Sequence, residues 1–144
     1  MGDSWFTGNS IQDAVLWNET TPTIIPVFGG AGGSIAYGIN DSNEVVGNSW
    51  LTGNTAQHGF LYASGTVYDL NSVVAPGSGV TNIRVAASGD VINNLGQISA
   101  YGTYNGQTVA VLLTPTPEPA SAVFMAFGAS MLLMRRGKHR QRVR

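Results

Sequence analysis

The chain has 144 residues and a formal net charge of −1, but residues 1–119 hold all eight acidic residues and a single base, Arg84, which gives this part a charge of −7. An acidic body argues against nucleic acid as a partner, since phosphate binding needs Lys and Arg on the folded surface. The absence of cysteine excludes disulfides, thiolate metal sites and cysteine nucleophiles.

The first half of the chain contains an internal repeat. Residues 2–17 align without gaps on residues 47–62, at an offset of 45 residues, and several differing positions exchange like for like, as Trp17 does for Tyr62. The same region is rich in Gly, Asn, Ser and Thr, a composition that disfavours helices and supports short strands joined by tight turns.

A weaker third copy of the repeat follows. Residues 39–46 align on 92–99 and residues 59–62 on 110–113, at offsets of 53 and 51 residues. A unit of about 45 to 53 residues is typical of propeller blades or solenoid coils.

The central copy carries four short strand signals separated by polar turns. We predict the strands at residues 34–39, 44–50, 59–63 and 66–70. Four antiparallel strands per unit form a blade-like meander. We therefore expect an all-β repeat body over residues 1–113, resembling part of a β-propeller with about two and a half units.

The opening residues predict a truncated body. They lack the positive charge and apolar run of a signal peptide, and Met1 falls in the middle of a unit. We expect a misassigned start or a relic gene, because about two and a half blades cannot close a propeller.

Three motifs of the central copy carry a family resemblance. They are Ala36-Tyr37-Gly38-Ile39-Asn40, Val45-Val46-Gly47 and His58-Gly59-Phe60-Leu61-Tyr62. They resemble the bacterial extracellular HAF repeat, with Gly59 in place of the family's Ala. The resemblance covers roughly residues 2–113, and that family often occurs with the C-terminal signal described next.

The C-terminal thirty residues read as a hinge, a membrane segment and a basic stop. Residues 114–119 are Pro-rich, and residues 120–134 carry no charge. As a helix the uncharged run would reach about 23 Å, short of a bilayer core of about 30 Å, a gap that snorkelling and local thinning can close. Six of the seven basic residues follow it, which favours a cytoplasmic flank; the stop comprises Arg135, Arg136, Lys138 and Arg140, with Arg142 and Arg144 beyond.

The order of Pro117-Glu118-Pro119, apolar run and arginine cluster in residues 114–144 resembles the PEP-CTERM sorting signal of exported bacterial proteins. The resemblance implies processing by an exosortase-like transpeptidase that recognises the signal in the membrane. We therefore expect a non-catalytic surface or exopolysaccharide-matrix protein, held in the inner membrane with its body outside until it is released. Its expected partners are the exosortase-like enzyme, membrane lipid and an exopolysaccharide, with no nucleic acid. The alternatives are a surface enzyme of the glycan hydrolase class built on the propeller and an unprocessed tail-anchored repeat protein.

Four constellations could carry chemistry, and for each a structural role is favoured. The glycines of residues 29–33 precede a strand signal, so we expect a flexible turn between units and not a phosphate loop. His58, Asp69 and a serine could form a triad, but no nucleophile elbow surrounds any serine. Asp41 with Asn40 and Asn43 invites calcium, yet an Asx turn explains the pattern. The aromatic residues Trp5, Trp17, Trp50 and Tyr62 recur at repeat positions and favour packing between units over sugar stacking.

We therefore expect no catalytic residue, no metal and no cofactor.

Overall fold

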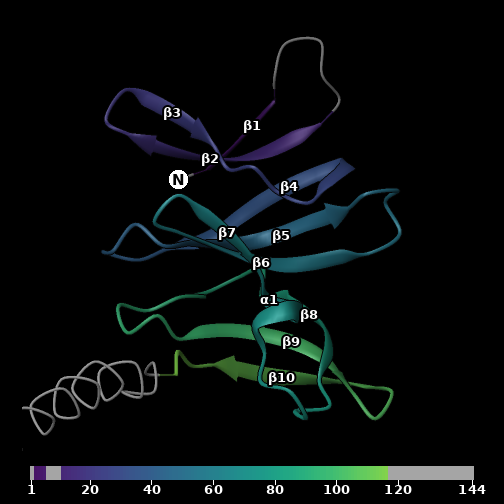
Figure 1. Cartoon of the computed structure of the whole chain (residues 1–144). Coiled ribbons are helices and arrows are strands. Elements are labelled where there is room, and N and C mark those ends of the chain that lie inside the picture. Colours follow the sequence, from purple (N-terminus) through teal and green to yellow (C-terminus); the bar gives the residue numbers. More distant parts are fainter. Residues whose placement is uncertain (1, 6–10, 117–144) are drawn as a thin grey trace, which may run out of the picture.

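The computed structural model (Figure 1) describes residues 11–116 together with the backbone of residues 2–5. These residues form ten strands and the short helix α1 (Leu70–Val73), and every strand pairing is antiparallel. The prediction of a mostly β body made of short antiparallel strands is therefore confirmed.

The strands form three sheets. The first sheet contains β1 (Gly2–Trp5), β2 (Gln12–Asn18) and β3 (Thr21–Ile24), in that order. The central sheet contains β4 (Gly29–Ile39), β5 (Val45–Leu51), β6 (Gln57–Ala63) and β7 (Thr66–Asp69). The third sheet contains β8 (Thr81–Val85), β9 (Ile98–Tyr104) and β10 (Gln107–Leu113), with β9 in the middle.

The central sheet is the predicted four-stranded meander. Its strands pair in chain order, and three of them both begin and end within two residues of the predicted bounds. The hairpin between β6 and β7 turns at Ser64 and Gly65, whose φ angles are 50° and 82°. Positive φ at both central residues matches the right-handed twist of the flanking strands.

The glycine run of residues 29–33 was expected to be a flexible turn, and that prediction is wrong. The run forms the first half of β4, which leaves its regular register with β5 between Gly29 and Ser34. A Cβ at Gly30 would meet the backbone of Trp50 at 2.5 Å, and one at Gly32 would overlap the Trp50 indole. The glycines therefore allow a close approach of two paired strands, a tertiary contact that turn propensity cannot reveal.

The pairing registers reproduce the sequence repeat. Gly2 pairs with Val15 in the first sheet, and 45 residues later Gly47 pairs with Phe60 in the central sheet. The remaining pairs of β1 with β2 and of β2 with β3 recur in the same way in β5, β6 and β7. The first sheet therefore corresponds to the last three strands of the central sheet.

The weaker third copy also has a structural counterpart. Val45 pairs with Tyr62 in the central sheet, and at the offsets of 53 and 51 residues Ile98 pairs with Leu113. Strands β9 and β10 are thus the counterparts of β5 and β6.

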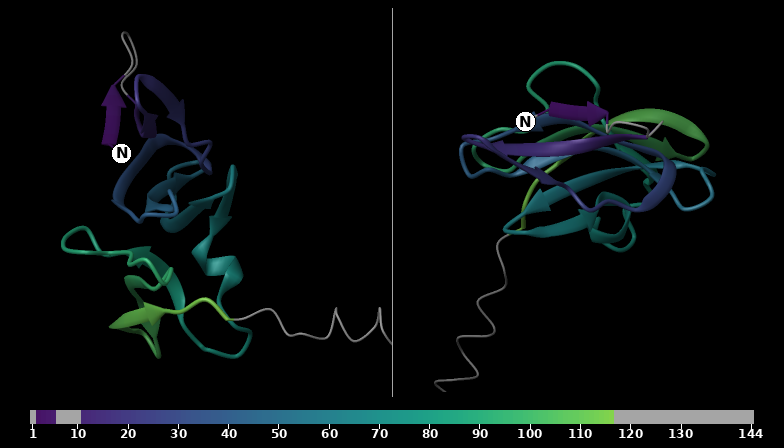
Figure 2. Two further views of the ribbon diagram at one scale, coloured as in Figure 1. Left: turned by 90° about the vertical axis from the view of Figure 1, so that its left-hand side faces the viewer. Right: turned by 90° about the horizontal axis from the view of Figure 1, so that it is seen from above.

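The three sheets stack face to face in chain order, as both Figure 1 and Figure 2 show. Val45 and Val46 are both fully buried, because neighbouring residues of a strand point to opposite faces of the sheet. Val45 belongs to the cluster between the first and central sheets, with Ala14, Ile25, Ala36 and Phe60. Val46 belongs to the cluster between the central and third sheets, with Leu70, Ile83, Val85, Val91, Ile92, Ile98 and Ala100. The central sheet is therefore covered on both faces.

Within the described residues, the three sheets close into neither a barrel nor a propeller. Residues 2–5 and 11–116 include no helix long and apolar enough to cross a bilayer. The predicted membrane segment at 120–134 lies outside the described residues, as do Pro117, Glu118 and Pro119 and the basic positions Arg135, Arg136, Lys138 and Arg140.

Candidate functional site

The residues of the HAF-like motifs lie side by side on β4, β5 and β6. The cross-strand pairs join Ala36 to Gly47, Gly38 to Val46, Ile39 to Val45, Gly47 to Phe60 and Val46 to Leu61. Ala36, Val45 and Phe60 are buried against the first sheet, and Leu61 packs on the cluster shared with the third sheet. The motif thus forms the two internal packing faces of the central sheet.

Two motif glycines are required by close packing. A Cβ at Gly47 would overlap the carbonyl oxygen of Ile35 and approach the Phe60 ring to 2.8 Å. A Cβ at Gly38 would lie 2.5 Å from Cγ2 of Val91, in the segment between β8 and β9. Real Cβ atoms do not approach their neighbours so closely, so a larger residue at either position would displace strands or sheets.

Two asparagine turns show how the repeat unit is built. Oδ1 of Asn40 accepts hydrogen bonds from the backbone N–H groups of Ser42 and Glu44, at 3.1 and 3.0 Å. Fifty-three residues later, Oδ1 of Asn93 accepts from the N–H groups of Leu95 and Gln97, both at 3.0 Å. These are Asx turns, in which the side chain satisfies backbone donors that no strand partner reaches.

The two turns also bind each other across the central and third sheets. Nδ2 of Asn40 donates to the carbonyl oxygen of Asn93 at 3.1 Å. The backbone N–H of Asp41 donates to Oδ1 of Asn94 at 3.0 Å, and Nδ2 of Asn94 donates to Oδ2 of Asp41 at 2.6 Å. Oδ1 of Asn40 and Oδ2 of Asp41, two of the oxygens considered as calcium ligands, are thus engaged in hydrogen bonds, which supports the predicted Asx role. The described residues include no group of three or more His, Asp or Glu side chains placed to hold a metal ion.

Two further asparagines hold the edge of β8. Asn48, which is 5% exposed, donates from Nδ2 to the carbonyl oxygen of Val85 at 3.1 Å and accepts from the Val85 N–H at 2.8 Å. Asn71 makes the same two contacts with Ile83, at 3.0 and 2.7 Å. The backbone groups of β8 that face the central sheet therefore bond to side-chain amides. A buried strand edge without a neighbouring strand needs such hydrogen-bond partners.

These amide contacts were missed in the sequence, although a signal for Asn48 existed. In the predicted strand, Asn48 shares a face with the apolar residues Val46 and Trp50, two residues to either side. A polar side chain on such a face needs a buried hydrogen-bond partner. The position of Asn93 was visible in the alignment of the third copy with the second. Asn71 carries no comparable signal, because its partner lies in a segment with no recognisable repeat.

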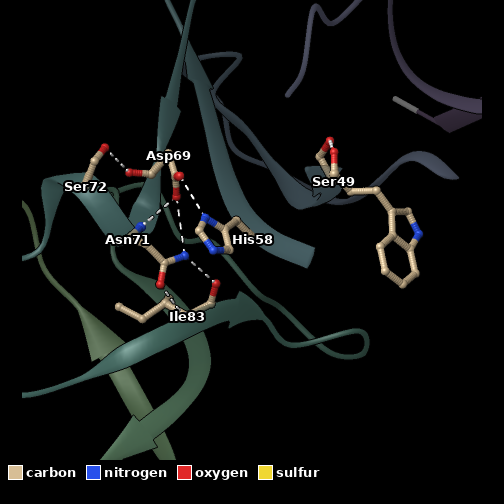
Figure 3. A network of polar contacts seen from close by, with 7 residues as sticks. Ser49, His58, Asp69, Asn71, Ser72 and Ile83 are labelled. Atoms are coloured by element: carbon tan, nitrogen blue, oxygen red, sulfur yellow. Dashed lines mark hydrogen bonds and ion pairs between the residues drawn. The ribbon is translucent and has the colours of Figure 1, made fainter. Parts of the chain in front are cut away.

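His58 and Asp69 are brought together, as the triad hypothesis required. His58 Nδ1 lies 2.8 Å from Asp69 Oδ2, and the two side chains are 20% and 26% exposed. Oδ1 of Asp69 also accepts the N–H of Asn71 at 2.9 Å and so caps helix α1 (Figure 3). The aspartate therefore orders the end of β7 and the beginning of α1, a structural task.

Ser49 is the serine opposite His58 in the register of β5 and β6. Its hydroxyl is fully buried and lies within hydrogen-bond distance of the carbonyl oxygens of Gly33 and Trp50, at 3.4 and 3.2 Å. In Figure 3 it stands apart from the His58 imidazole. His58 and Asp69 therefore contact each other, whereas the Ser49 hydroxyl, opposite His58 in register, contacts backbone carbonyl oxygens.

The recurring aromatic residues occupy different environments. Tyr62 packs against the cluster between the first and central sheets, whereas its repeat counterpart Trp17 is 51% exposed. Trp50 is half-buried and its indole lies against Gly32. Packing between units thus accounts for Tyr62, the aromatic ring of Trp50 packs within its own sheet, and the side chain of Trp5 lies outside the described residues.

Arg84, the only base of residues 1–119, lies with its guanidinium carbon 5.1 Å from the centroid of the Tyr101 ring. A cation over an aromatic face at this distance is held by the ring quadrupole. Within the described residues, no buried side-chain nitrogen or oxygen lacks a hydrogen-bond partner. Of the buried polar side chains, Ser34, Asn40 and Asn48 bond to groups outside the central sheet, whereas Ser49 contacts backbone oxygens within it.

Comparisons with protein-family models, with curated proteins and with solved structures gave no match to the chain. The two family resemblances therefore stay predictions from the sequence motifs.

Proposed function

We propose that the chain is a non-catalytic repeat protein of the bacterial surface or of its exopolysaccharide matrix, sorted through its C-terminal signal by an exosortase-like transpeptidase. The observation that carries the proposal is the order of Pro117-Glu118-Pro119, an uncharged run and an arginine cluster at the end of the chain. In this proposal the three stacked sheets are blade-like units of a partial propeller, displayed on the outer side of the inner membrane.

The sorting step follows from the chemistry of the tail. An apolar helix at residues 120–134 holds the Pro-Glu-Pro segment at the membrane surface, where a Pro-flanked backbone is extended and accessible to an enzyme. The basic residues Arg135, Arg136, Lys138 and Arg140 resist translocation and bind anionic lipid headgroups. After processing, the body is released to the cell surface or the matrix.

The described body supports a structural role. Its buried asparagines bond strand edges and turns, and its HAF-like motif residues fill the two packing faces. Asp41, Glu44 and Asp69 each contact a neighbouring His or Asn side chain of the fold. These groups hold the sheets together, as a scaffold requires.

A surface enzyme of the glycan hydrolase class is the alternative from another functional class. The carboxylate of Asp69, held 2.8 Å from His58, is the observation in its favour. Hydrolysis of a glycoside would use two carboxyl groups about 5 to 9.5 Å apart on either side of one bond. If the enzyme reading holds, Asp69→Asn abolishes hydrolysis of a matrix polysaccharide; on the present proposal neither form hydrolyses it.

Intact-mass spectrometry tests the sorting step. The chain, joined to an export signal, is expressed in a host that contains the exosortase and in the same host lacking it. We expect the mature protein to lose the segment after Pro119 only in the first host. The triple variant with alanine at Pro117, Glu118 and Pro119 should keep its full mass, and the matched variant Pro115→Ala should still be processed.

An unchanged mass in both hosts contradicts the proposal and leaves the unprocessed tail-anchored protein as the better account.

A further inference from the structure

Two tripeptides of the chain have the form Asn-X-Ser/Thr in which X is not proline. They are Asn18-Glu19-Thr20 and Asn40-Asp41-Ser42, and the sequence contains no third. In secreted proteins, an asparagine in this pattern accepts an N-linked glycan when it lies in an accessible surface segment. The pattern is the same at both asparagines, so the difference between them comes from the fold.

The first tripeptide forms the tip of the hairpin between β2 and β3 (Figure 1). Asn18 ends β2 and pairs with Thr21 at the start of β3. Glu19, with a φ of 53°, and Thr20 form the turn between them. All three residues of the tripeptide are exposed, and no hydrogen bond joins the Asn18 side chain to another described residue. The Asn18 amide is therefore accessible to an enzyme.

The exposure of this hairpin is a property of the repeat unit. At the offset of 45 residues, the turn between β6 and β7 has Ser64, with a φ of 50°, in the place of Glu19. Ser64, Gly65 and Thr66 are exposed, although both faces of the central sheet are covered. Stacking covers the faces of a sheet and leaves this hairpin tip in solvent. Asn18 therefore stays accessible whether or not a further sheet lies against the first sheet.

The second tripeptide is closed to an enzyme by its own contacts. The Asn40 side chain is 8% exposed. Its Nδ2, the atom that would carry a glycan, donates to Oε2 of Glu44 at 2.5 Å and to the carbonyl oxygen of Asn93 at 3.1 Å. An amide nitrogen has two N–H donors, and these two contacts use both. The folded chain therefore protects Asn40 and presents Asn18.

We propose that Asn18 is a glycan-attachment site, modified by an oligosaccharyltransferase that uses an oligosaccharide linked to a lipid pyrophosphate. In the reaction, Nδ2 of Asn18 forms a bond to the anomeric carbon of the donor sugar and releases one proton. The bond from that carbon to the pyrophosphate oxygen breaks, and the lipid pyrophosphate leaves with its electron pair. The inference rests on the proposed display of the body outside the inner membrane but not on the sorting step.

Glycosylation of the purified full chain tests the site. The chain in mild detergent is incubated with a single-subunit oligosaccharyltransferase that accepts Asn-X-Ser/Thr and with its lipid-linked oligosaccharide. Intact mass and peptide mapping then locate the product. We expect a mass increase of one glycan per chain, carried by Asn18. The assay contains no exosortase and needs no export, so a negative result here would not contradict sorting, and an unprocessed tail would not contradict this site.

Matched variants separate the tripeptide from its surroundings. Thr20→Ala removes the hydroxyl of the tripeptide and should abolish the modification, whereas Thr20→Ser should keep it. Thr21→Ala changes an exposed neighbour outside the tripeptide and should leave the modification unchanged. A peptide of residues 36–46 presents Asn40 without the fold and should be modified.

A short Asn-X-Thr acceptor peptide in the same tube shows that the enzyme is active. An unmodified chain beside this modified acceptor would overturn the proposal, as would modification that survives Thr20→Ala. A glycan on Asn40 in the folded chain, or no glycan on the peptide of residues 36–46, would show that burial does not decide between the two asparagines and would overturn it as well.

Discussion

The buried amide of Asn48 offers the sharpest test of how the sheets are joined. Its Nδ2 and Oδ1 bond the carbonyl and N–H of Val85, a residue that is fully buried in the third sheet. Asn48→Ala removes both partners and leaves two buried backbone groups unsatisfied. Each such group costs about 1–3 kcal/mol, so we expect the free energy of unfolding to fall by about 2–6 kcal/mol.

The assay is thermal unfolding of the full chain in mild detergent, followed by circular dichroism of the strand signal. A loss of this size should lower the melting temperature by about 10–20 °C for a body of this length. Asn18→Ala is the matched control, because Asn18 is exposed and lies at the end of β2. We expect it to change stability by no more than about 0.5 kcal/mol.

The variant Asn48→Asp separates the amide geometry from simple polarity. It keeps an acceptor for the Val85 N–H but places a second oxygen, with a buried charge, against the Val85 carbonyl. It should therefore be at least as unstable as Asn48→Ala near neutral pH. If either variant unfolds within about 1 kcal/mol of the parent, the bidentate contact does not hold the two sheets together and the reasoning is wrong.

Three further predictions use the same unfolding assay. Asn40→Ala should lower the free energy of unfolding more than Asn93→Ala, because the Asn40 side chain is 8% exposed and also bonds the second turn, whereas Asn93 is exposed. Equal losses of stability would show that the contact between the turns is negligible. Gly47→Ala should lower the free energy of unfolding by about 1–3 kcal/mol, since the added Cβ would meet the Ile35 carbonyl and the Phe60 ring. No loss of stability would mean that β4 and β5 can move apart at no cost. Asp69→Ala should cost about 1 kcal/mol more than His58→Ala, because the aspartate also caps α1, while its partly exposed contact with His58 contributes less than about 1 kcal/mol. A larger loss of stability for His58→Ala would contradict this.

Much of the central sheet could be predicted because its signals are local. Alternation of side chains along a strand and polar residues at turns depend on neighbours in sequence, so β5, β6 and β7 were located to within about two residues. The start of β4 could not be located in this way. Its glycines are needed where the strand meets Trp50 of β5, and that contact exists only after the two strands pair.

The candidate site was predictable in part for the same reason. The HAF-like motif positions were visible as a repeat, yet their role in the two packing faces came from the stacking of sheets. His58 and Asp69 were paired in the sequence as a triad hypothesis; the cap that Asp69 places on α1 was not visible, because it depends on where β7 ends.

The sequence alone determined the strand class and the repeat. The structure shows that the pairing register follows this repeat, because an offset of 45 residues carries the pair of Gly2 and Val15 onto that of Gly47 and Phe60. Only the tertiary structure decided which faces are covered and which amides join the sheets. The contact of Asn48 with Val85 spans 37 residues, and that of Asn40 with Asn93 spans 53. Such contacts depend on how whole sheets pack, whereas alternation and turn chemistry act between neighbours in the chain.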